Sequence, residues 1–402
     1  MLDISLRAKT TPPSPLRSLA PLAAQAEARG ITVHKLNIGQ PDLSPPKEFL
    51  DGLTLFPHST VAYESSQGNL KLIQSWVDWL NNKYSTGLTN KNMIITSGSS
   101  EALTFVFSVC CDVGDEILVF DPTYANYTGF ASLAGVTLTA VLCEFAHNFQ
   151  PPDALTILNS ITPKTKAILL CNPNNPTGTT LNPVQLQELL KMCEALNIFL
   201  IVDEVYREFV YDQHTPHSIL QHCNHSQNVI VIDSVSKRYS LCGARIGCVV
   251  SYNSQVLQSI LNLASTRVAA PTIEQYATAH MLQHIKDEYL VQARNEYNLR
   301  RTALVASLMQ IPGVQVSTPD GGFYVLVSLP VQDSTHFAKY LLESFNYNNE
   351  TLFLAPAGGF YTASRGGLNC VRIAFVHSVT TLQRAALILE KALEQYHTDG
   401  NP

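Results

Sequence analysis

Charged residues are scarce in this 402-residue chain: they make up 14% of the sequence, and the formal net charge is −6. A nucleic-acid-binding protein usually presents a basic field, and no spare basic helical segment precedes Leu36. No apolar run is long enough to span a bilayer. The N-terminal residues carry an early Asp3 and several prolines instead of the apolar segment of a signal peptide. We therefore expect neither a nucleic acid nor a membrane as a partner.

The sequence also lacks a cysteine framework. Its nine cysteines are scattered, odd in number and form no C-x-x-C pair, which is typical of reduced thiols in the cytoplasm. One cluster has the residue types of a metal site: His214, His217, His222, Cys223 and His225. Its spacing matches no closed four-ligand zinc pattern, and polar residues and a proline between the histidines favour an exposed loop. We expect no metal.

Apolar residues make up 46% of the chain, which is enough for a large core and more than one domain. Six near-continuous apolar runs end in small or polar residues, at 92–96, 116–121, 166–171, 198–203, 228–233 and 246–252. Such runs, unlike alternating ones, indicate strands buried on both faces of a mostly parallel sheet that is covered by helices. In such α/β sheets, ligands bind beyond the carboxyl ends of the strands.

The pattern changes near Asp287, where a long helical stretch is followed by shorter strands and helices. We predict a large domain over residues 46–290 and a smaller α+β domain over 291–402. The N-terminal segment 1–45 is expected to join the smaller domain, because "KLNIGQPD" is typical of a connecting strand end.

Two turns at the expected sheet edge suit an anion. In "TSGSSEAL", Gly98, Ser99 and Ser100 lie where a strand becomes a helix, and backbone N–H groups at a helix start favour negative charge. Gly/Ser turns before helices are also common without any ligand. The second turn, "DSVSKRYSLCGARIG", adds two hydroxyls and a guanidinium: Ser234, Ser236 and Arg245. Because arginine can grip two phosphate oxygens, the two turns together indicate a phosphate site.

Four polar side chains at strand ends suit an aromatic, cationic ring. Asp203 ends the run "IFLIVD", and its carboxylate needs a buried cation, either a structural partner or a pyridinium nitrogen. Tyr206 and Asn175 could each hydrogen-bond a ring hydroxyl, although an asparagine in "NPNNPTG" also fits ordinary turn chemistry. Tyr124 offers a ring for stacking, or is a packed surface tyrosine.

Lys237 follows the run 228–233 directly and lies among the phosphate-type residues. A primary amine in such a place can form a Schiff base with an aldehyde. A merely solvated lysine does not explain the serines and the arginine around it.

These segments together resemble the class I/II aminotransferases of the fold type I pyridoxal-phosphate enzymes, over nearly the whole chain. The resemblance rests on "SVSKRYSLCGARIG", "NPNNPTG", "DEVY", "GSSEAL", "YESSQG" and "CVRIAFV". It implies an α/β fold: a mostly parallel seven-stranded sheet flanked by helices, with a smaller α+β domain from both termini. It implies pyridoxal 5'-phosphate as the cofactor and Lys237 as its anchor. Ser99, Ser100, Ser234, Ser236 and Arg245 fall at the phosphate, and Tyr124, Asn175, Asp203 and Tyr206 at the ring.

The resemblance also implies substrate and partner contacts. Arg372 is placed to clamp the substrate α-carboxylate, with Gly39 near it, and Asn175 is placed to contact the substrate as well as the ring. Tyr63 is placed to reach the cofactor phosphate of a neighbouring subunit in a homodimer. The implied reaction moves an amino group from an L-amino acid, with aspartate favoured, to 2-oxoglutarate. Arg267 of the adjacent subunit is a candidate second cation for a dicarboxylate. A lyase or decarboxylase on the same scaffold, or an aminotransferase for aromatic or other amino acids, is the alternative.

Overall fold

The computed structural model describes residues 2–5, 8–9, 11, 17–362 and 366–400. Its largest feature is a seven-stranded sheet with the order β2-β8-β7-β6-β5-β3-β4. The strands span Met93–Thr96 (β2), Glu116–Asp121 (β3), Thr137–Leu142 (β4), Thr165–Cys171 (β5), Phe199–Asp203 (β6), Val229–Ser234 (β7) and Gly247–Ser251 (β8). The five strands from β7 to β4 are parallel, and β8 is antiparallel to both of its neighbours. The predicted mostly parallel α/β sheet is confirmed.

Helices cover both faces of this sheet. On one face lie α5 (Ser99–Cys110), α6 (Asn126–Ala134) and α10 (Ser254–Arg267). The other face is covered by α3 (Lys47–Thr54), α4 (Leu70–Tyr84), α7 (Ala154–Asn159), α8 (Pro183–Leu196) and α11 (Thr272–His284). The short helix α9 (Val235–Arg238) continues directly from β7.

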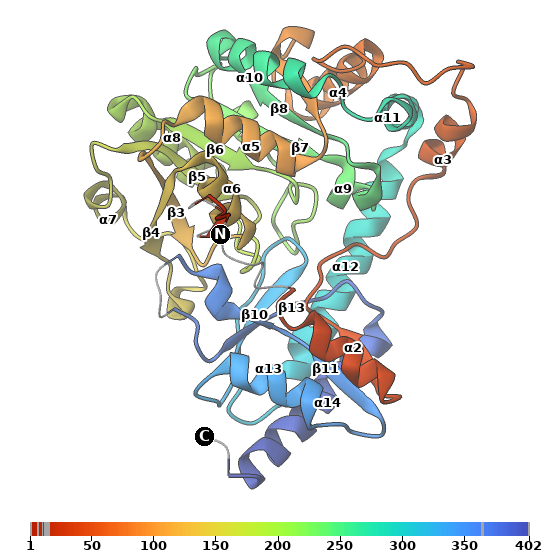
Figure 1. The fold of residues 1–402 in the computed structure, drawn as a ribbon, viewed down its shortest axis with the longest axis vertical. Helices are drawn as coiled ribbons and strands as arrows, with labels where there is room; N and C mark the ends of the chain where they lie inside the picture. The colour runs from red at the N-terminus through yellow and green to blue at the C-terminus, as the bar shows by residue number, and fades with distance from the viewer. Residues whose placement is uncertain (1, 6–7, 10, 12–16, 363–365, 401–402) are drawn as a thin grey trace.

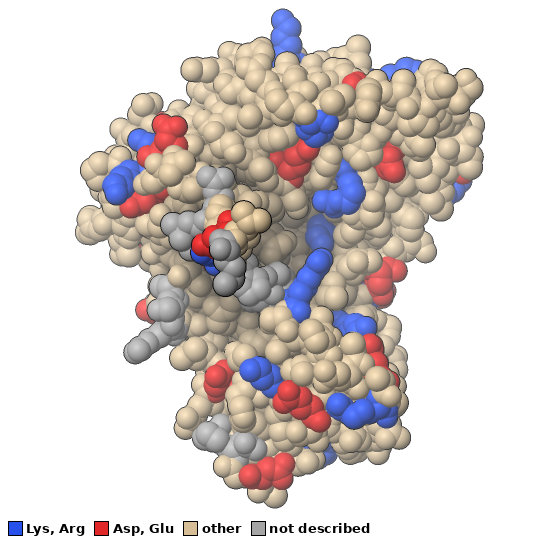
Figure 2. Space-filling model, viewed as in Figure 1, with Lys and Arg blue, Asp and Glu red and all other residues tan. Residues whose placement is uncertain are grey.

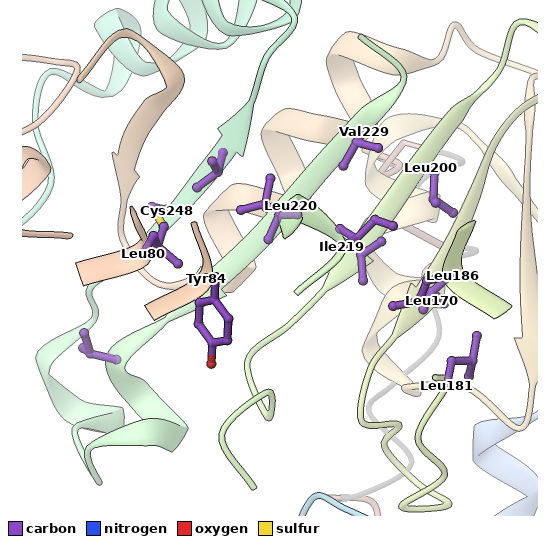
Figure 3. Packing of buried hydrophobic residues seen from close by; sticks show 14 of the residues in the cluster. Leu80, Tyr84, Leu170, Leu181, Leu186, Leu200, Ile219, Leu220, Val229 and Cys248 are labelled. Carbon is purple, nitrogen blue, oxygen red and sulfur yellow. The ribbon is translucent and has the colours of Figure 1, made fainter. Parts of the chain in front are cut away.

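The two helix layers explain why the strands are apolar at every position. Along β5, Ala167 and Leu169 pack under one layer, whereas Ile168 and Leu170 pack under the other. Successive side chains of a strand point to opposite faces, so a sheet covered on both sides needs apolar residues throughout. Figure 3 shows members of the second layer, with Leu170, Leu200 and Val229 on neighbouring strands.

A smaller unit is built from the chain's C-terminal part. It contains α12 (Asp287–Leu308), β9 (Gln315–Val316), β10 (Tyr324–Ser328), α13 (Ser334–Glu343), β11 (Glu350–Phe353), β12 (Ala355–Pro356), β13 (Cys370–Ala374) and α14 (Val379–Thr398). Four strands form a sheet in the order β12-β13-β10-β9. The long helix α12 runs from the large sheet down into this unit (Figure 1).

The N-terminal segment contributes to the smaller unit. Helix α2 (Ala20–Ala28) packs on α13, and β1 (Thr32–Lys35) pairs in parallel with β11. Figure 1 shows α2 beside α13, far from the large sheet's helices. These contacts support the domain limits 1–45, 46–290 and 291–402, which stay a prediction.

Local sequence signals fix several helix ends. Asn182 caps α8 by accepting from the amides of Val184 and Gln185, and Pro183 occupies the first turn. The same helix ends at Asn197, which has a positive φ of 55°. Single turns of 3-10 helix occur at Asn90–Asn92, Phe145–His147, Ile219–Gln221, Cys242–Ala244 and Ala357–Phe360.

Candidate active site

A cavity of about 310 Å³ lies between the large sheet and the smaller unit, at the carboxyl edge of the parallel strands. Figure 2 shows the molecule's surface hollowed between its upper and lower parts. The cavity is of the size that holds small-molecule ligands. Of the residues expected at the cofactor, six line it: Ser99, Tyr124, Asn175, Asp203, Tyr206 and Lys237. The residues expected at the substrate are Gly39, Arg372 and again Asn175, and all three line it.

Lys237 reaches this cavity from α9, which begins where β7 ends. Its Nζ donates to the carbonyl oxygen of Gly39 at 3.0 Å, so the amine is placed against the segment that follows β1. A side chain at position 39 would lie 2.0 Å from the hydroxyl of Tyr324, so only glycine fits there. Cys242 Sγ lies 3.9 Å from the same Nζ.

A cluster of buried ion pairs holds α9 against the end of β7. Both carboxylate oxygens of Asp233 accept from Arg238 at 2.6 Å, and one also accepts from Arg207 at 2.8 Å. All three side chains are buried. Because Arg238 directly follows Lys237, these contacts fix the helix that carries the amine. The sequence did not predict this cluster, because nothing in the pattern around Arg207, Asp233 and Arg238 indicates that these charged side chains are buried.

Asp203 is a buried carboxylate without a cation. It accepts from the Tyr127 hydroxyl at 3.0 Å and from the Val205 amide at 3.3 Å, and it forms no ion pair with any described residue. Burial raises the pKa of Asp203 to about 7, against a smaller opposing effect of these hydrogen bonds. A cationic ligand group at this end of the cavity would offset the free-energy cost of ionising the buried Asp203 carboxyl group.

The raised pKa predicts how the stability of the cofactor-free protein depends on pH. Between about pH 4 and pH 7 the folded state binds more protons at Asp203 than the unfolded state, so the free energy of unfolding falls as the pH rises. The loss is complete above pH 7 and reaches at most about 4 kcal/mol. We expect cofactor-free Asp203→Asn to melt at a higher temperature than the unmodified protein at pH 8, with the advantage lost at pH 5. An advantage of equal size at both pH values, measured by scanning calorimetry, would contradict this environment for Asp203.

Arg372 presents the opposite case, a buried guanidinium without an anion. It is 1% exposed, and it donates to Asn175 Oδ1 at 2.9 Å and to the Asn37 carbonyl oxygen at 2.5 Å. Its Nε has no hydrogen-bond partner among the described residues, and no carboxylate there pairs with it. Burial lowers the pKa of Arg372 from its ordinary value. The Arg372 guanidinium is therefore available to bind an anion that enters the cavity.

The anion-suited turns meet beside the cavity, but they do not contribute equally. The Arg245 guanidinium packs on Gly98, where an added Cβ would lie 2.4 Å from Nη2. Arg245 is exposed, donates to the carbonyl oxygens of Cys242 and Ser97, and pairs with no described carboxylate. Ser99 opens α5 and lines the cavity. An anion here meets a free guanidinium and a helix N-terminus.

The other predicted serines are placed less directly. Ser234 is buried and caps α9: its Oγ accepts from the Ser236 amide at 3.1 Å and lies 2.8 Å from Ser236 Oγ. Ser100 is exposed on the first turn of α5. None of the three is among the residues that line the cavity.

Aromatic side chains form the cavity's remaining wall. Tyr124 packs edge-on against Tyr127, and burial raises the pKa of Tyr124 to about 12. The Tyr206 hydroxyl lies 2.8 Å from that of Tyr324, whose ring also lies 4.3 Å from the Arg372 guanidinium. Sequence reasoning missed Tyr324 and Tyr127. Tyr324 follows the paired glycines of "GGFY" in the smaller unit, a signal for a close approach of the backbone, whereas nothing in the sequence marks Tyr127.

Three groups of candidates lie away from the cavity. Tyr63 is 84% exposed. Arg267 donates to the Ile95 carbonyl oxygen at 3.2 Å and lies 3.3 Å from Glu101, so it is paired within its own chain. In the 214–225 cluster, His214 lies near Asp320 and His225 stacks on Tyr252, whereas the rings of His217 and His222 are 6.4 Å apart. The described residues include no group of three or more His, Cys, Asp or Glu that could hold a metal. No helix in the described part of the chain is long and apolar enough to cross a membrane.

The model of the family "Aminotransferase class I and II" matches residues 31–389. The chain belongs to this family. Class I and II aminotransferases use pyridoxal phosphate, and the chain is accordingly an aminotransferase. The cavity fits that cofactor, because a buried unpaired carboxylate suits a ring nitrogen and an unpaired Arg245 beside a helix start suits a phosphate.

Relatives of this aminotransferase differ in their named substrates. It is 30% identical to the (5-formylfuran-3-yl)methyl phosphate transaminase of Methanocaldococcus jannaschii, covering 90% of this chain and 92% of that one. It is 29% identical to an aspartate aminotransferase of Pyrococcus horikoshii, covering 95% of both chains. The structure of an alanine aminotransferase from Pyrococcus furiosus superposes with a TM-score of 0.90 at 28% identity, covering 98% of this chain and 100% of that one.

Proposed function

We propose that this aminotransferase moves an amino group from an L-amino acid, with aspartate favoured, to 2-oxoglutarate, and that Lys237 anchors its cofactor. The observation that carries the proposal is one cavity that holds a buried carboxyl group at Asp203 and a buried guanidinium at Arg372, neither with an ion-pair partner among the described residues, together with Lys237. Burying unpaired charge costs free energy, so such residues are expected where ligands supply the opposite charges.

Each group on the cavity has a role toward the cofactor in this proposal. Asp203 pairs with the ring nitrogen, and Tyr124 stacks on the ring. Asn175 and Tyr206 contact the ring hydroxyl. The phosphate is held by Arg245, with the helix start at Ser99 and Ser100 and the turn of Ser234 and Ser236. When bound, pyridoxal phosphate supplies an aldehyde for the substrate's amino group and a ring that accepts electrons.

The chain's own residues bind and deprotonate the substrate. Arg372 fixes the α-carboxylate by two charge-assisted hydrogen bonds, beside Gly39. The Lys237 amine is held at the Gly39 carbonyl oxygen in the free protein, and it would take the proton from the substrate Cα and deliver it to the carbon that was the cofactor's aldehyde. Tyr324 packs on Arg372 and keeps its guanidinium in place.

A homodimer with shared active sites is part of the proposal. Tyr63 is nearly fully exposed, and so are apolar side chains near it in the sequence, among them Val61 (61%) and Leu70 (67%). A subunit interface over this segment would cover these side chains. In the dimer, Tyr63 reaches the cofactor phosphate of the neighbouring subunit. We place the enzyme in the cytoplasm, which the nine free cysteines support.

A screen of half-reactions tests the proposed function. The purified enzyme loaded with pyridoxal phosphate is mixed with single amino acids, and the loss of the cofactor's visible absorbance is followed. We expect aspartate to give the fastest loss, and 2-oxoglutarate to restore the absorbance. Release of ammonia, pyruvate or carbon dioxide, without conversion of 2-oxoglutarate to glutamate, would instead indicate a lyase or decarboxylase.

A further inference from the structure

The cavity is lined by one more cationic side chain than the proposed function uses. Its described lining includes three cations, Arg17, Lys237 and Arg372, and one anion, Asp203. In the proposed function Lys237 meets the aldehyde, Arg372 meets one carboxylate, and Arg245 outside the lining meets the phosphate. Arg17 is left without an assigned partner.

The position of Arg17 at the cavity is fixed by its neighbours. Its carbonyl oxygen accepts from the Ala20 amide at 3.0 Å, at the start of α2. Two residues on, Leu19 is buried against Phe353 at the end of β11, and Phe353 also lines the cavity. The backbone that carries Arg17 is therefore attached to the same unit as Arg372 and Tyr324, while its side chain remains exposed.

Arg17 is also electrostatically free. It forms no ion pair with any residue that the structure describes, although the chain carries an excess of acidic residues. Two other arginines of the smaller unit do form ion pairs, Arg384 with Glu350 at 2.9 Å and Arg300 with Asp42 at 2.6 Å. Arg17 and Arg372 border the same cavity, where like charges repel, and an anion bound between them would offset that repulsion.

We infer that Arg17 determines substrate specificity by binding an anionic group on the substrate's side chain. This inference rests on the proposed aminotransferase function. Arg372 takes the α-carboxylate, and Arg17, at the cavity's mouth, takes the second anion. A guanidinium binds carboxylate and phosphate by the same paired donors, so the ligand class is an amino acid with an anionic side chain. In this inference Arg17, rather than Arg267 of the adjacent subunit, supplies the second cation; Arg267 lies 3.3 Å from Glu101 of its own chain.

The inference is tested on the loaded enzyme with Arg17→Ala and Arg17→Lys. Half-reactions compare aspartate with alanine, and O-phosphoserine with serine. We expect Arg17→Ala to lower kcat/KM for at least one anionic substrate by about 10- to 100-fold, the cost of one charge-assisted contact, and to change kcat/KM for the neutral ones less than about threefold. Arg17→Lys should recover part of the loss. Arg29→Ala, at the other end of α2, is the matched control and should change neither.

A binding measurement provides a second readout that does not depend on turnover. Calorimetry with maleate, a dicarboxylate, and with propionate should show weaker maleate binding in Arg17→Ala and unchanged propionate binding. A loss confined to aspartate assigns a carboxylate, and a loss confined to O-phosphoserine assigns a phosphate. Equal losses for anionic and neutral substrates, or no loss for any, would overturn the role of Arg17. An unmodified enzyme that converts no amino acid would instead refute the proposed function itself.

Discussion

Replacing Lys237 by alanine is expected to reduce amino transfer more than about a thousandfold. The variant loses both the amine that anchors the cofactor and the base that moves the proton at the substrate Cα. We expect the visible absorbance of the bound cofactor to change as well, because no amine is left at that position to condense with the aldehyde. The fold should persist, since the Asp233–Arg238 contacts that support α9 do not involve the Lys237 side chain.

Lys166→Ala is the matched control for this experiment. Lys166 lies on β5 of the same sheet but at the strand's opposite end, and its nearest acidic atom, in Asp115, is 3.9 Å away. This variant should keep its activity and its absorbance. Near-full turnover in Lys237→Ala, with circular dichroism unchanged, would show that another residue is the base.

Arg372→Ala is expected to weaken binding of amino acids and 2-oxo acids about a hundredfold or more, which corresponds to about 3 kcal/mol. The guanidinium is desolvated in the free protein and lacks a carboxylate partner, so a substrate carboxylate forms a strong contact with it. The effect should appear in KM and in the Kd of substrate analogues, whereas cofactor absorbance should be retained.

One further variant separates charge from geometry at position 372, and another serves as the control. Arg372→Lys keeps the positive charge but loses the paired donors, so its binding should fall between those of the alanine variant and the unmodified enzyme. Arg384→Ala removes an arginine of the same unit that pairs with Glu350 and does not line the cavity, so substrate binding should not change. Unchanged Kd values in Arg372→Ala would exclude Arg372 from carboxylate binding.

Much of the large sheet could be predicted from the sequence because its strands are buried on both faces. The six apolar runs correspond to β2, β3, β5, β6, β7 and β8. The strand absent from those runs, β4, is at the sheet's edge, and of its six residues only Val141 is buried. With polar threonines at positions 137 and 139, it lacks the continuous apolar pattern that marks a central strand.

The site could be predicted only where motif and chemistry coincide. Asp203 ends β6, and Lys237 and Asn175 come soon after β7 and β5, so the sheet's topology brings them to one edge. Tyr324 and Arg17 come from elements that are distant in sequence and meet the sheet only through the smaller unit. The burial of Asp203 and Arg372 without counter-ions likewise depends on tertiary packing, which single-sequence patterns do not record.

Chemical fixation of the cofactor tests the central claim most directly. The enzyme loaded with pyridoxal phosphate is reduced with borohydride, digested and analysed by mass spectrometry. The account predicts a pyridoxyl phosphate adduct on the peptide that contains Lys237. An adduct on a different lysine, or none at all on a protein that binds the cofactor, would contradict it.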